Sequence, residues 1–306
     1  MRLRSIQVLR GIAAMAVVAH HAFDGPRLGA AGVDLFFVIS GFIMATCTGA
    51  RLPGQFLADR AWRIYPLWLI AVAPWIVMNP ESFLVIVRSI TLWPVYGNQF
   101  LNPALGVGWT LSFELLFYAG FALALATRAT VPLIIFCMCL ILGLTTNHVL
   151  FWYLGSPLAL EFLLGVAVAR IPRLPLAGVA ALALGIVGFA MLPAGYYDQA
   201  FGYGAMLRVF AWGIPSAMLL YGAWSLEKYF ADRTFDIPVL VGGASYSIYL
   251  FHQLVLKGSH GLAGFILSGI AGVLIYLSLE RYIMRAKPRW RKVPKAKPKE
   301  AVLSQT

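Results

Sequence analysis

The chain has 306 residues, of which 60% are hydrophobic and only 12% are charged, and its formal net charge is +12. Because soluble domains carry about a quarter charged residues, this composition excludes an ordinary soluble protein and indicates an integral membrane protein. The three cysteines lie within apolar runs. Their spacing is typical of neither a disulfide framework nor a metal site, so we expect no metal.

Ten apolar runs in the sequence are candidates for membrane-spanning helices, since a crossing needs about 20 mostly apolar residues. They cover residues 6–23, 32–48, 64–79, 109–127, 131–147, 157–170, 176–193, 205–224, 241–257 and 261–284. A further short run, 82–93, has charged residues at or near its ends, so we expect it to dip into the membrane or lie along its outer face. The predicted fold class is an all-α polytopic membrane protein with about ten transmembrane helices.

Positive charges predict the orientation of these helices, because Lys and Arg gather in short loops on the cytoplasmic side. Arginines precede the first run and occupy the segment 49–63, and basic residues also follow the fourth, sixth and eighth runs. The alternate loops are poor in positive charge: 148–156 and 194–204 have none, and 24–31 has only Arg27. This alternation predicts that both termini are cytoplasmic.

Eight positive charges are concentrated in residues 285–299. Such a cluster in a soluble protein would suggest nucleic-acid binding. Directly after an apolar run, it favours a cytoplasmic anchor that meets anionic lipid headgroups. We therefore predict one transmembrane domain over 1–284 and a basic, disordered cytoplasmic tail over 285–306, with no nucleic-acid partner.

The first apolar run contains the stretch LRGIAAMAVVAHHAF, residues 9–23, which carries three ionisable side chains. Arg10 and His21 are eleven residues apart, which puts them on one face of a helix and about 16 Å apart along its axis. His20 is turned about 100° away. The shared face has a fixed cation near the cytoplasmic end and a titratable base deeper in the membrane, which suits a long anionic ligand.

Two further stretches place charges beside the membrane. In GVDLFFVISGF, residues 32–42, Asp34 is either a helix-end residue near the positive end of the helix dipole or part of a site. In DRAWRIYP, residues 59–66, Arg60 and Arg63 share a helix face. They either follow the charge rule for cytoplasmic loops or bind phosphate, for which the planar guanidinium is suited.

The stretch WTLSFELLFY, residues 109–118, contains a carboxylate in or close to the membrane. Trp109 and Ser112 are three residues apart, and Glu114 and Tyr118 are four apart, so the members of each pair are neighbours on a helix. A glutamate in this position is costly if it faces lipid. For Glu114 we prefer a functional role to a purely structural pair.

Another polar stripe lies near the C-terminus, in SYSIYLFHQ, residues 245–253. Ser245, Tyr249 and His252 follow the spacing of a single helix face. Glu161 is a lone carboxylate in an apolar run, and pairing with a neighbour would explain it without a functional role.

Taken together, these five stretches resemble the acyltransferase-3 family of integral membrane acyltransferases. The first family helix carries a basic residue and a histidine spaced as Arg10 and His21 are here. Further family motifs resemble residues 32–42, 60–66, 109–118, 162–165 and 245–252. Many members have a second glutamate after Glu114, where this chain has Leu115. The opening residues and the second motif look most like the exopolysaccharide O-acetyltransferase branch.

The resemblance implies a transmembrane acyltransferase domain in the bacterial cytoplasmic (inner) membrane. The implied reaction moves an acyl group, expected to be acetyl, from cytoplasmic acetyl-CoA as co-substrate to a hydroxyl of a cell-surface or exported polysaccharide or its lipid-linked precursor. The expected catalytic residues are His21, Glu114 and Asp34. His21 would act as general base or carry the acyl group itself, and Glu114 or Asp34 would orient its imidazole or bind the acceptor. Asp24 is a further candidate for orienting it.

The expected substrate-binding residues combine a basic mouth with polar and aromatic side chains. They are Arg10, Arg60, Arg63, Trp109, Ser112, Tyr118 and His252. The arginines would neutralise the phosphates of the coenzyme, and its pantetheine arm would follow the face from Arg10 to His21.

Two other classes of protein stay open at this point. One is a transporter or flippase of a lipid-linked sugar without acyl-transfer chemistry, which paired Gly/Pro breaks in two related halves would favour. We see no such symmetry in the sequence. The other is a membrane subunit of a polysaccharide synthesis complex with no chemistry of its own.

Overall fold

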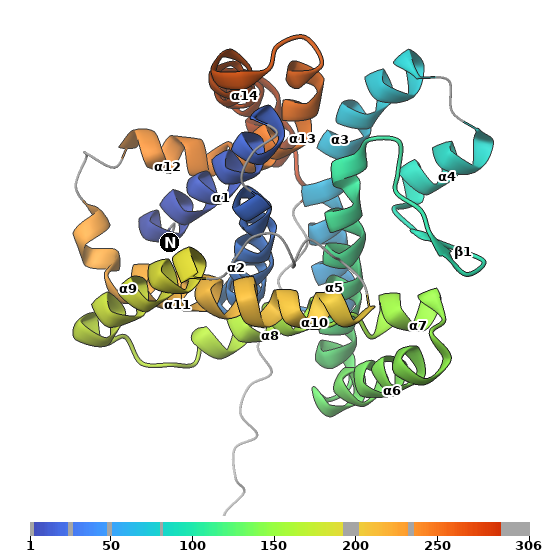
Figure 1. Cartoon of the computed structure of the whole chain (residues 1–306), viewed down its shortest axis with the longest axis horizontal. Helices are drawn as coiled ribbons and strands as arrows, with labels where there is room; N and C mark the ends of the chain where they lie inside the picture. Colours follow the sequence, from blue (N-terminus) through green and yellow to red (C-terminus); the bar gives the residue numbers. More distant parts are fainter. Residues whose placement is uncertain are drawn as a thin grey trace, which may run out of the picture.

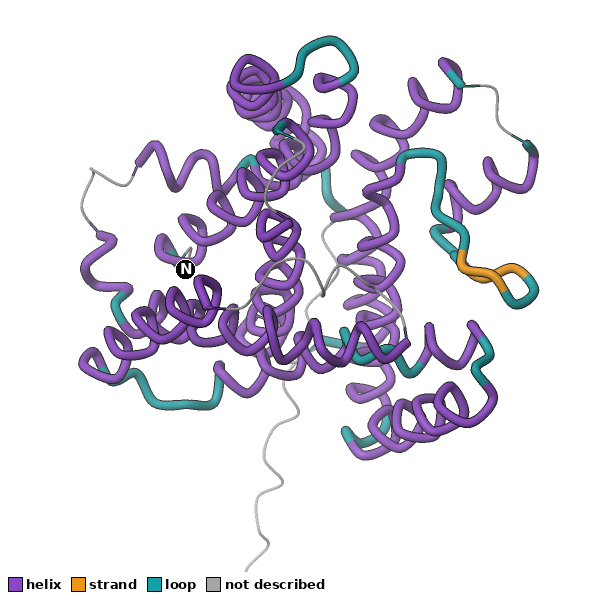
Figure 2. The backbone as a smooth tube through the Cα atoms, viewed as in Figure 1, coloured by secondary structure: helices purple, strands orange, loops and turns teal. Residues whose placement is uncertain are grey.

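A computed structural model describes residues 3–23, 27–47, 51–79, 82–191, 202–231 and 236–288. Helices dominate these residues (Figure 1). The strands in this part of the chain are β1 (Val95–Tyr96) and β2 (Gln99–Phe100), which pair antiparallel in a small hairpin drawn in orange in Figure 2. Gly97 takes a positive φ of 56° in the turn, a conformation that glycine adopts without strain.

The helical elements follow one another with short connections. The first half has α1 (Arg4–Ala22), η1 (Arg27–Ala31), α2 (Gly32–Cys47), α3 (Pro53–Met78), α4 (Phe83–Thr91), η2 (Gly106–Gly108), α5 (Trp109–Ala126), α6 (Thr130–Thr146) and α7 (Val149–Leu154). The second half has α8 (Ala159–Val168), α9 (Pro175–Met191), α10 (Gly202–Arg208), η3 (Val209–Gly213), α11 (Ile214–Ser225), η4 (Glu227–Ala231), α12 (Asp236–Gly243), α13 (Ser245–Leu256), α14 (Gly261–Ile275), η6 (Tyr276–Glu280) and α15 (Arg281–Arg285). Two of these short segments, η3 and η6, are π-helical.

Six helical stretches in the described residues are long and apolar enough to cross a membrane. They are Leu28–Thr46, Pro53–Met78, Gly106–Ala126, Val149–Val168, Gly202–Ser225 and Gly261–Arg285. A seventh crossing results if α12 and α13, which meet at a bend of 70°, form one broken span. The protein is therefore an all-α, multi-pass membrane protein, while ten crossings and two cytoplasmic termini stay predictions.

Several boundaries differ from those that hydropathy predicts. Helix α3 begins at Pro53 and not at residue 64, so much of the expected loop 49–63 forms its first turns. Proline is favourable at a helix start, because its missing N–H would have no partner there. Helix α7 occupies most of the expected loop 148–156 and joins α8 in one candidate span. The run 82–93 becomes the short helix α4, too short to cross.

Helix α1 packs against α2, α12, α13 and α14 (Figure 1). Its buried face is made of small and β-branched residues such as Ala13, Ala14 and Val17. The close approach to α12 depends on Gly242, where an added Cβ would lie 1.7 Å from the Gln7 carbonyl oxygen. Small residues allow helix backbones in membranes to approach in this way.

Helices α2 and α8 form a second tightly packed pair. A Cβ at Gly165 of α8 would lie 1.9 Å from the Val38 carbonyl oxygen, and a Cβ at Gly41 of α2 would lie 1.9 Å from the Phe162 carbonyl oxygen. The two glycines thus bring backbone against backbone. This contact sets the position of α2, which carries Asp34 and Ser40.

Candidate active site

A cavity of about 730 Å³ lies between α1, α2, α3, α5, α12, α13 and the η6–α15 segment. Its lining follows α2 from Val33 to Ile43, a length of about 15 Å along the helix. Exposed residues such as Arg285 line one part, and the buried Thr110 and Tyr249 line another. Small-molecule pockets typically have volumes of about 300–1,000 Å³, so the cavity is large enough for a ligand.

Besides the exposed Arg281 and Arg285, three arginines line the cavity: Arg10 from α1, and Arg60 and Arg63 from α3. Only Arg63 of the three has a carboxylate partner within the described residues, Glu280, whose Oε1 lies 2.6 Å from its Nη1. The guanidinium of Arg60 instead lies over the Phe56 ring, 5.3 Å from its centroid. Arg10 and Arg60 therefore leave positive charge in the cavity, whereas that of Arg63 is neutralised.

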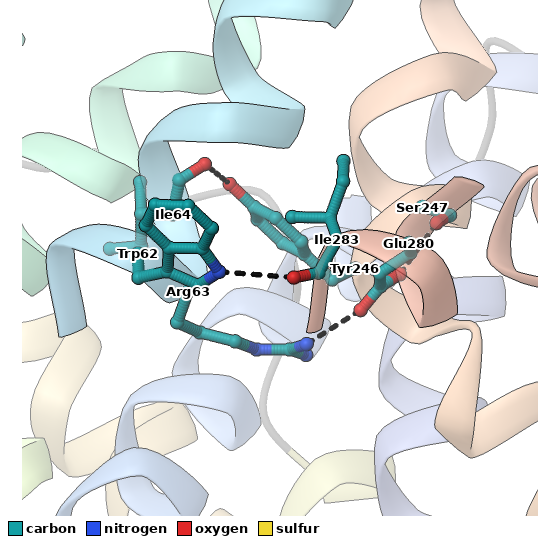
Figure 3. Close-up of polar contacts among 7 residues, drawn as sticks. All are labelled: Trp62, Arg63, Ile64, Tyr246, Ser247, Glu280 and Ile283. Atoms are coloured by element: carbon teal, nitrogen blue, oxygen red, sulfur yellow. Dashed lines mark hydrogen bonds and ion pairs between the residues drawn. The ribbon is translucent and has the colours of Figure 1, made fainter. Parts of the chain in front are cut away.

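Glu280 is the last residue of the π-helical segment η6, and its side chain is 1% exposed. One carboxylate oxygen pairs with Arg63 and the other accepts a hydrogen bond of 2.6 Å from the Ser247 hydroxyl (Figure 3). Our sequence reasoning missed this residue. It could have been predicted as a carboxylate inside the apolar run 261–284, because an ionisable side chain is costly there unless it has a partner or a function.

Two further hydrogen bonds tie α3 to the C-terminal helices around Arg63 (Figure 3). The Trp62 indole donates to the Ile283 carbonyl oxygen at 3.0 Å, and the Tyr246 hydroxyl donates to the Ile64 carbonyl oxygen at 2.8 Å. The Arg63 guanidinium also lies 5.3 Å from the centroid of the Tyr246 ring. These contacts hold Arg63 in one place.

Glu114 faces the cavity from α5. Its Oε1 accepts a hydrogen bond of 3.2 Å from the Ser40 hydroxyl and another from the Tyr118 hydroxyl. The Arg60 guanidinium lies 5.5 Å from the centroid of the Tyr118 ring. Glu114 and Arg60 are thus linked through Tyr118, and together they give this part of the cavity both an acceptor and a cation.

Asp34 lies outside the cavity lining and is fully buried. Its two carboxylate oxygens each lie 2.8 Å from a guanidinium nitrogen of Arg208, the last residue of α10. Such two-pronged pairs are among the strongest hydrogen bonds in proteins. The sequence suggested that Asp34 orients His21. In the structure, its ion pair with Arg208 instead joins α2 to α10.

The Trp109 ring lies close to the same buried ion pair. The Arg208 guanidinium lies 5.6 Å from the centroid of the Trp109 ring and 4.9 Å from that of Trp212. Glu161 is fully buried near this pair and packs against Gly213. The sequence signal for Arg208 was an arginine inside the apolar run 205–224.

His21 and His252 meet beyond the cavity lining. Nε2 of His252 lies 3.4 Å from Nδ1 of His21, and the ring centroids are 5.0 Å apart. Each Nδ1 also lies near a carbonyl oxygen of its own helix, that of Val17 at 2.9 Å from His21 and that of Tyr249 at 2.7 Å from His252. Two imidazoles from α1 and α13 are therefore held together in the interior.

Tyr249 is a lining residue that also contacts this histidine pair. Its ring lines the cavity, and the ring centroid lies 6.1 Å from that of His252. The Tyr249 hydroxyl donates to the Val107 carbonyl oxygen at 2.9 Å and lies 2.8 Å from the Thr110 hydroxyl. We predicted that the coenzyme follows the face of α1 from Arg10 to His21. The cavity includes Arg10, but its lining ends before His21.

Comparison with known proteins identifies the family. The family model described as "Acyltransferase domain" matches residues 3–279. The chain belongs to the acyltransferase-3 family. The match contains the histidine pair and the cavity lining up to Tyr276.

Two relatives align with most of the chain. It is 33% identical over 297 residues to "Exopolysaccharide production protein ExoZ" of Rhizobium meliloti (strain 1021), covering 84% of this chain and 90% of that protein. It is 26% identical over 341 residues to "Putative membrane-bound transacylase BcsY" of Komagataeibacter xylinus, covering 92% and 82%. No solved structure gives a significant match.

In this acyltransferase-3 protein, the residues predicted from the sequence fall into two groups. Those that line the cavity are Arg10, Arg60, Arg63, Glu114 and Tyr118. Those outside its lining are His21, His252, Asp34, Trp109 and Ser112. Ser112 is buried, and its carbonyl oxygen accepts a hydrogen bond from Tyr153. Asp24 and the basic tail beyond residue 288 lie outside the described residues.

Proposed function

We propose that this membrane acyltransferase moves an acetyl group from acetyl-CoA to a hydroxyl of a cell-surface or exported polysaccharide or its lipid-linked precursor. The similarity to a protein named for exopolysaccharide production supports a sugar acceptor. The proposed location is the bacterial cytoplasmic membrane, with the N-terminal end of α1 toward the cytoplasm, where the basic segments predict it to be.

The observation that carries the proposal is that Arg10 and Arg60 line the cavity without a carboxylate partner in the described part of the chain. Arg10 and Arg60 supply positive charge to the cavity between the helices. The exposed Arg281 and Arg285 line the same cavity at its surface. Phosphate groups bind well to guanidinium groups, and an acyl-CoA combines such phosphates with a thin, mostly uncharged arm.

The reaction needs a base, a hydroxyl and a thioester. We assign the base to His21, which removes the hydroxyl proton of the acceptor while its oxygen attacks the thioester carbonyl. The carbon–sulfur bond then breaks, the new ester carries the acetyl group, and the released thiolate receives the proton from the His21 imidazolium. Because the cavity lining ends short of His21, side chains such as that of Tyr249 have to move aside before the thioester reaches His21.

The proposal is tested with purified protein in lipid bilayers, labelled acetyl-CoA and polysaccharide or lipid-linked oligosaccharide. We expect the label on the acceptor as a base-labile ester. His21→Ala should lower the rate on the order of 10²–10⁴-fold, the usual contribution of a general base. His148→Ala is the control, because His148 caps the start of α7 and lies outside the cavity lining.

Two outcomes would contradict the proposal. One is labelled acetyl-CoA that stays intact while sugar moves across the bilayer, as a flippase without acyl transfer would behave. The other is acetylation at the normal rate by a correctly inserted His21→Ala variant, which would remove His21 from the mechanism.

A further inference from the structure

Helix α4 carries an arginine that the proposed reaction does not use. Arg88 is buried, with 8% of its surface exposed, and it lies outside the lining of the cavity. Its Nε and Nη1 atoms have no hydrogen-bond partner within the described residues, and no carboxylate there pairs with it. A guanidinium stays charged in proteins, and a buried charge without a partner is costly. Arg88 therefore needs an anion that the described part of the chain does not supply.

The residue after Arg88 shows how α4 is held against the protein. The Ser89 carbonyl oxygen accepts a hydrogen bond of 2.7 Å from the Trp68 indole of α3. The Ser89 hydroxyl accepts another, of 2.8 Å, from the backbone N–H of Ala104. The position of α4, and with it the burial of Arg88, is thus set by contacts with two other segments of the chain.

The other face of α4 is apolar and exposed. Phe83 is 82% exposed and Ile90 is 48% exposed. A helix too short to cross the bilayer, with one apolar face exposed, is typical of the membrane interface. Trp93 and Tyr96, which follow α4, are also exposed, and these two residue types are enriched at the same depth. Arg88 therefore lies on the protein side of a helix at the depth of the lipid headgroups.

This interface is expected to be the outer one. Helix α4 follows the end of α3, whereas Asp59 near the start of α3 pairs with Lys287, in a segment that the sequence predicts to be cytoplasmic. The chain then returns from the hairpin to the interior, where the Val107 carbonyl oxygen accepts a hydrogen bond from the cavity-lining Tyr249. Arg88 is thus placed on the side from which an exported sugar would reach the site.

We propose that Arg88 binds a membrane-anchored phosphate, that of a lipid-linked acceptor, and so holds the sugar at the outer side of the site. This inference rests on the proposed function, and it makes the lipid-linked precursor the acceptor rather than the finished polymer. A lipid-linked sugar carries its phosphate between the chain in the bilayer and the sugar, which is the depth at which Arg88 lies. The planar guanidinium also matches the geometry of phosphate oxygens.

Stability measurements separate a ligand-binding arginine from one that holds the fold together. Arg88→Met removes a charge that has no partner in the protein, so the unfolding temperature in detergent should stay the same or rise. Arg208→Met is the matched control, because Arg208 is 1% exposed and its loss leaves the buried Asp34 without its partner. The unfolding temperature of this variant should fall by several degrees. An equal fall in both variants would overturn the inference.

A small prenyl diphosphate provides a test that needs no activity. Farnesyl diphosphate should raise the unfolding temperature of the wild type by a few degrees, because it binds the folded protein. Most of this rise should be lost in Arg88→Met, and farnesol, which has no phosphate, should have little effect on either protein. An equal rise in the wild type and in Arg88→Met would overturn the inference, because the diphosphate would then bind elsewhere.

Acyl transfer tests the role with two matched acceptors, a lipid-linked oligosaccharide and the same oligosaccharide released from its lipid phosphate. The wild type should have the higher kcat/KM for the lipid-linked form. In Arg88→Met the ratio of the two kcat/KM values should fall about tenfold to a hundredfold, the usual loss for a hydrogen bond to a charged group. Arg128→Met, at an exposed position beyond the end of α5, is the control and should keep the ratio.

The outcomes distinguish this inference from the proposed function. If the wild type transfers acetyl groups and Arg88→Met keeps the ratio, the proposed function stands and the inference is overturned. A phospholipid headgroup at Arg88 would instead give a rise in unfolding temperature with phosphatidylglycerol that Arg88→Met loses, with the ratio unchanged, and this would also overturn it. If the wild type acetylates neither acceptor, the proposed function fails, while farnesyl diphosphate still decides whether Arg88 binds a membrane-anchored phosphate.

Discussion

Arg60 and Arg63 lie three residues apart on one helix face, yet their guanidinium groups have different surroundings. Arg63 pairs with the buried Glu280, and Arg60 lies over the rings of Phe56 and Tyr118. An ion pair neutralises its arginine, whereas stacking on an aromatic ring leaves the charge available to an anion. We therefore expect the two residues, equivalent in the sequence motif, to have separate functions.

We predict that Arg60→Ala raises the KM for acetyl-CoA by roughly tenfold, because it removes a charged contact to phosphate. Arg63→Ala should instead lower stability by about 1–3 kcal/mol, because it leaves the Glu280 carboxylate buried with only Ser247 as partner. Steady-state kinetics and thermal unfolding in the same detergent measure both effects. Equal effects of the two substitutions on both quantities would contradict the separation.

At the scale of elements, helix α2 connects the structural and the proposed catalytic parts. Asp34 ties its start to Arg208 of α10, and Ser40, six residues later, donates to Glu114 of α5. The contact of Gly165 with the α2 backbone holds the helix between these two partners. A shift of α2 would therefore disturb Glu114 as well as the buried ion pair.

We predict that Gly165→Ala destabilises the protein by about 1–3 kcal/mol and lowers acyl transfer, because the added methyl group forces α2 away from α8. Gly120→Ala is the matched control. No atom lies within 4 Å of a Cβ there, so a helix-favouring alanine should be tolerated. Thermal unfolding and transfer assays of both variants check this, and a Gly165→Ala variant as stable and active as Gly120→Ala would contradict it.

At the scale of the whole molecule, two groups of helix ends differ in their charged residues. One joins the start of α3 to the end of α15, and the other joins the end of α3 to the end of α13. Asp59 near the start of α3 lies 2.6 Å from Lys287, which follows α15, and 3.1 Å from Arg51. At the end of α13, Lys257 contacts Trp75 and Asn79 near the end of α3. The first group contains Lys287 and Arg51 and belongs to segments that the sequence analysis places on the cytoplasmic side, so we predict that it faces the cytoplasm.

We predict that a membrane-impermeant thiol reagent added to intact cells labels Lys257→Cys but not Arg285→Cys. The background would carry serine in place of Cys47, Cys137 and Cys139. Permeabilised cells provide the control, because both exposed positions should then react. The opposite labelling in intact cells would invert the topology and place the mouth of the cavity outside.

The sequence by itself determined the class of the protein and indicated several of the residues that line the cavity. The low content of charged residues excludes an ordinary soluble domain, and the recurrent apolar runs indicate a multi-pass helical membrane protein. Ionisable groups within such runs are costly in lipid, so Arg10 and Glu114 could be expected to face the interior, and both line the cavity. Hydropathy did not give the helix boundaries. For example, α3 begins at Pro53 and contains charged residues that the hydropathy pattern assigns to a loop.

Only the tertiary structure decided which buried groups meet. Asp34 and Arg208 are 174 residues apart, and His21 and His252 are 231 apart, so local spacing holds no information on either pair. Their partners are chosen by how helices pack, which depends on backbone contacts such as that at Gly165. A buried charge or imidazole needs a polar partner because no water is available to solvate it. The sequence alone does not show which of the other polar residues that partner is.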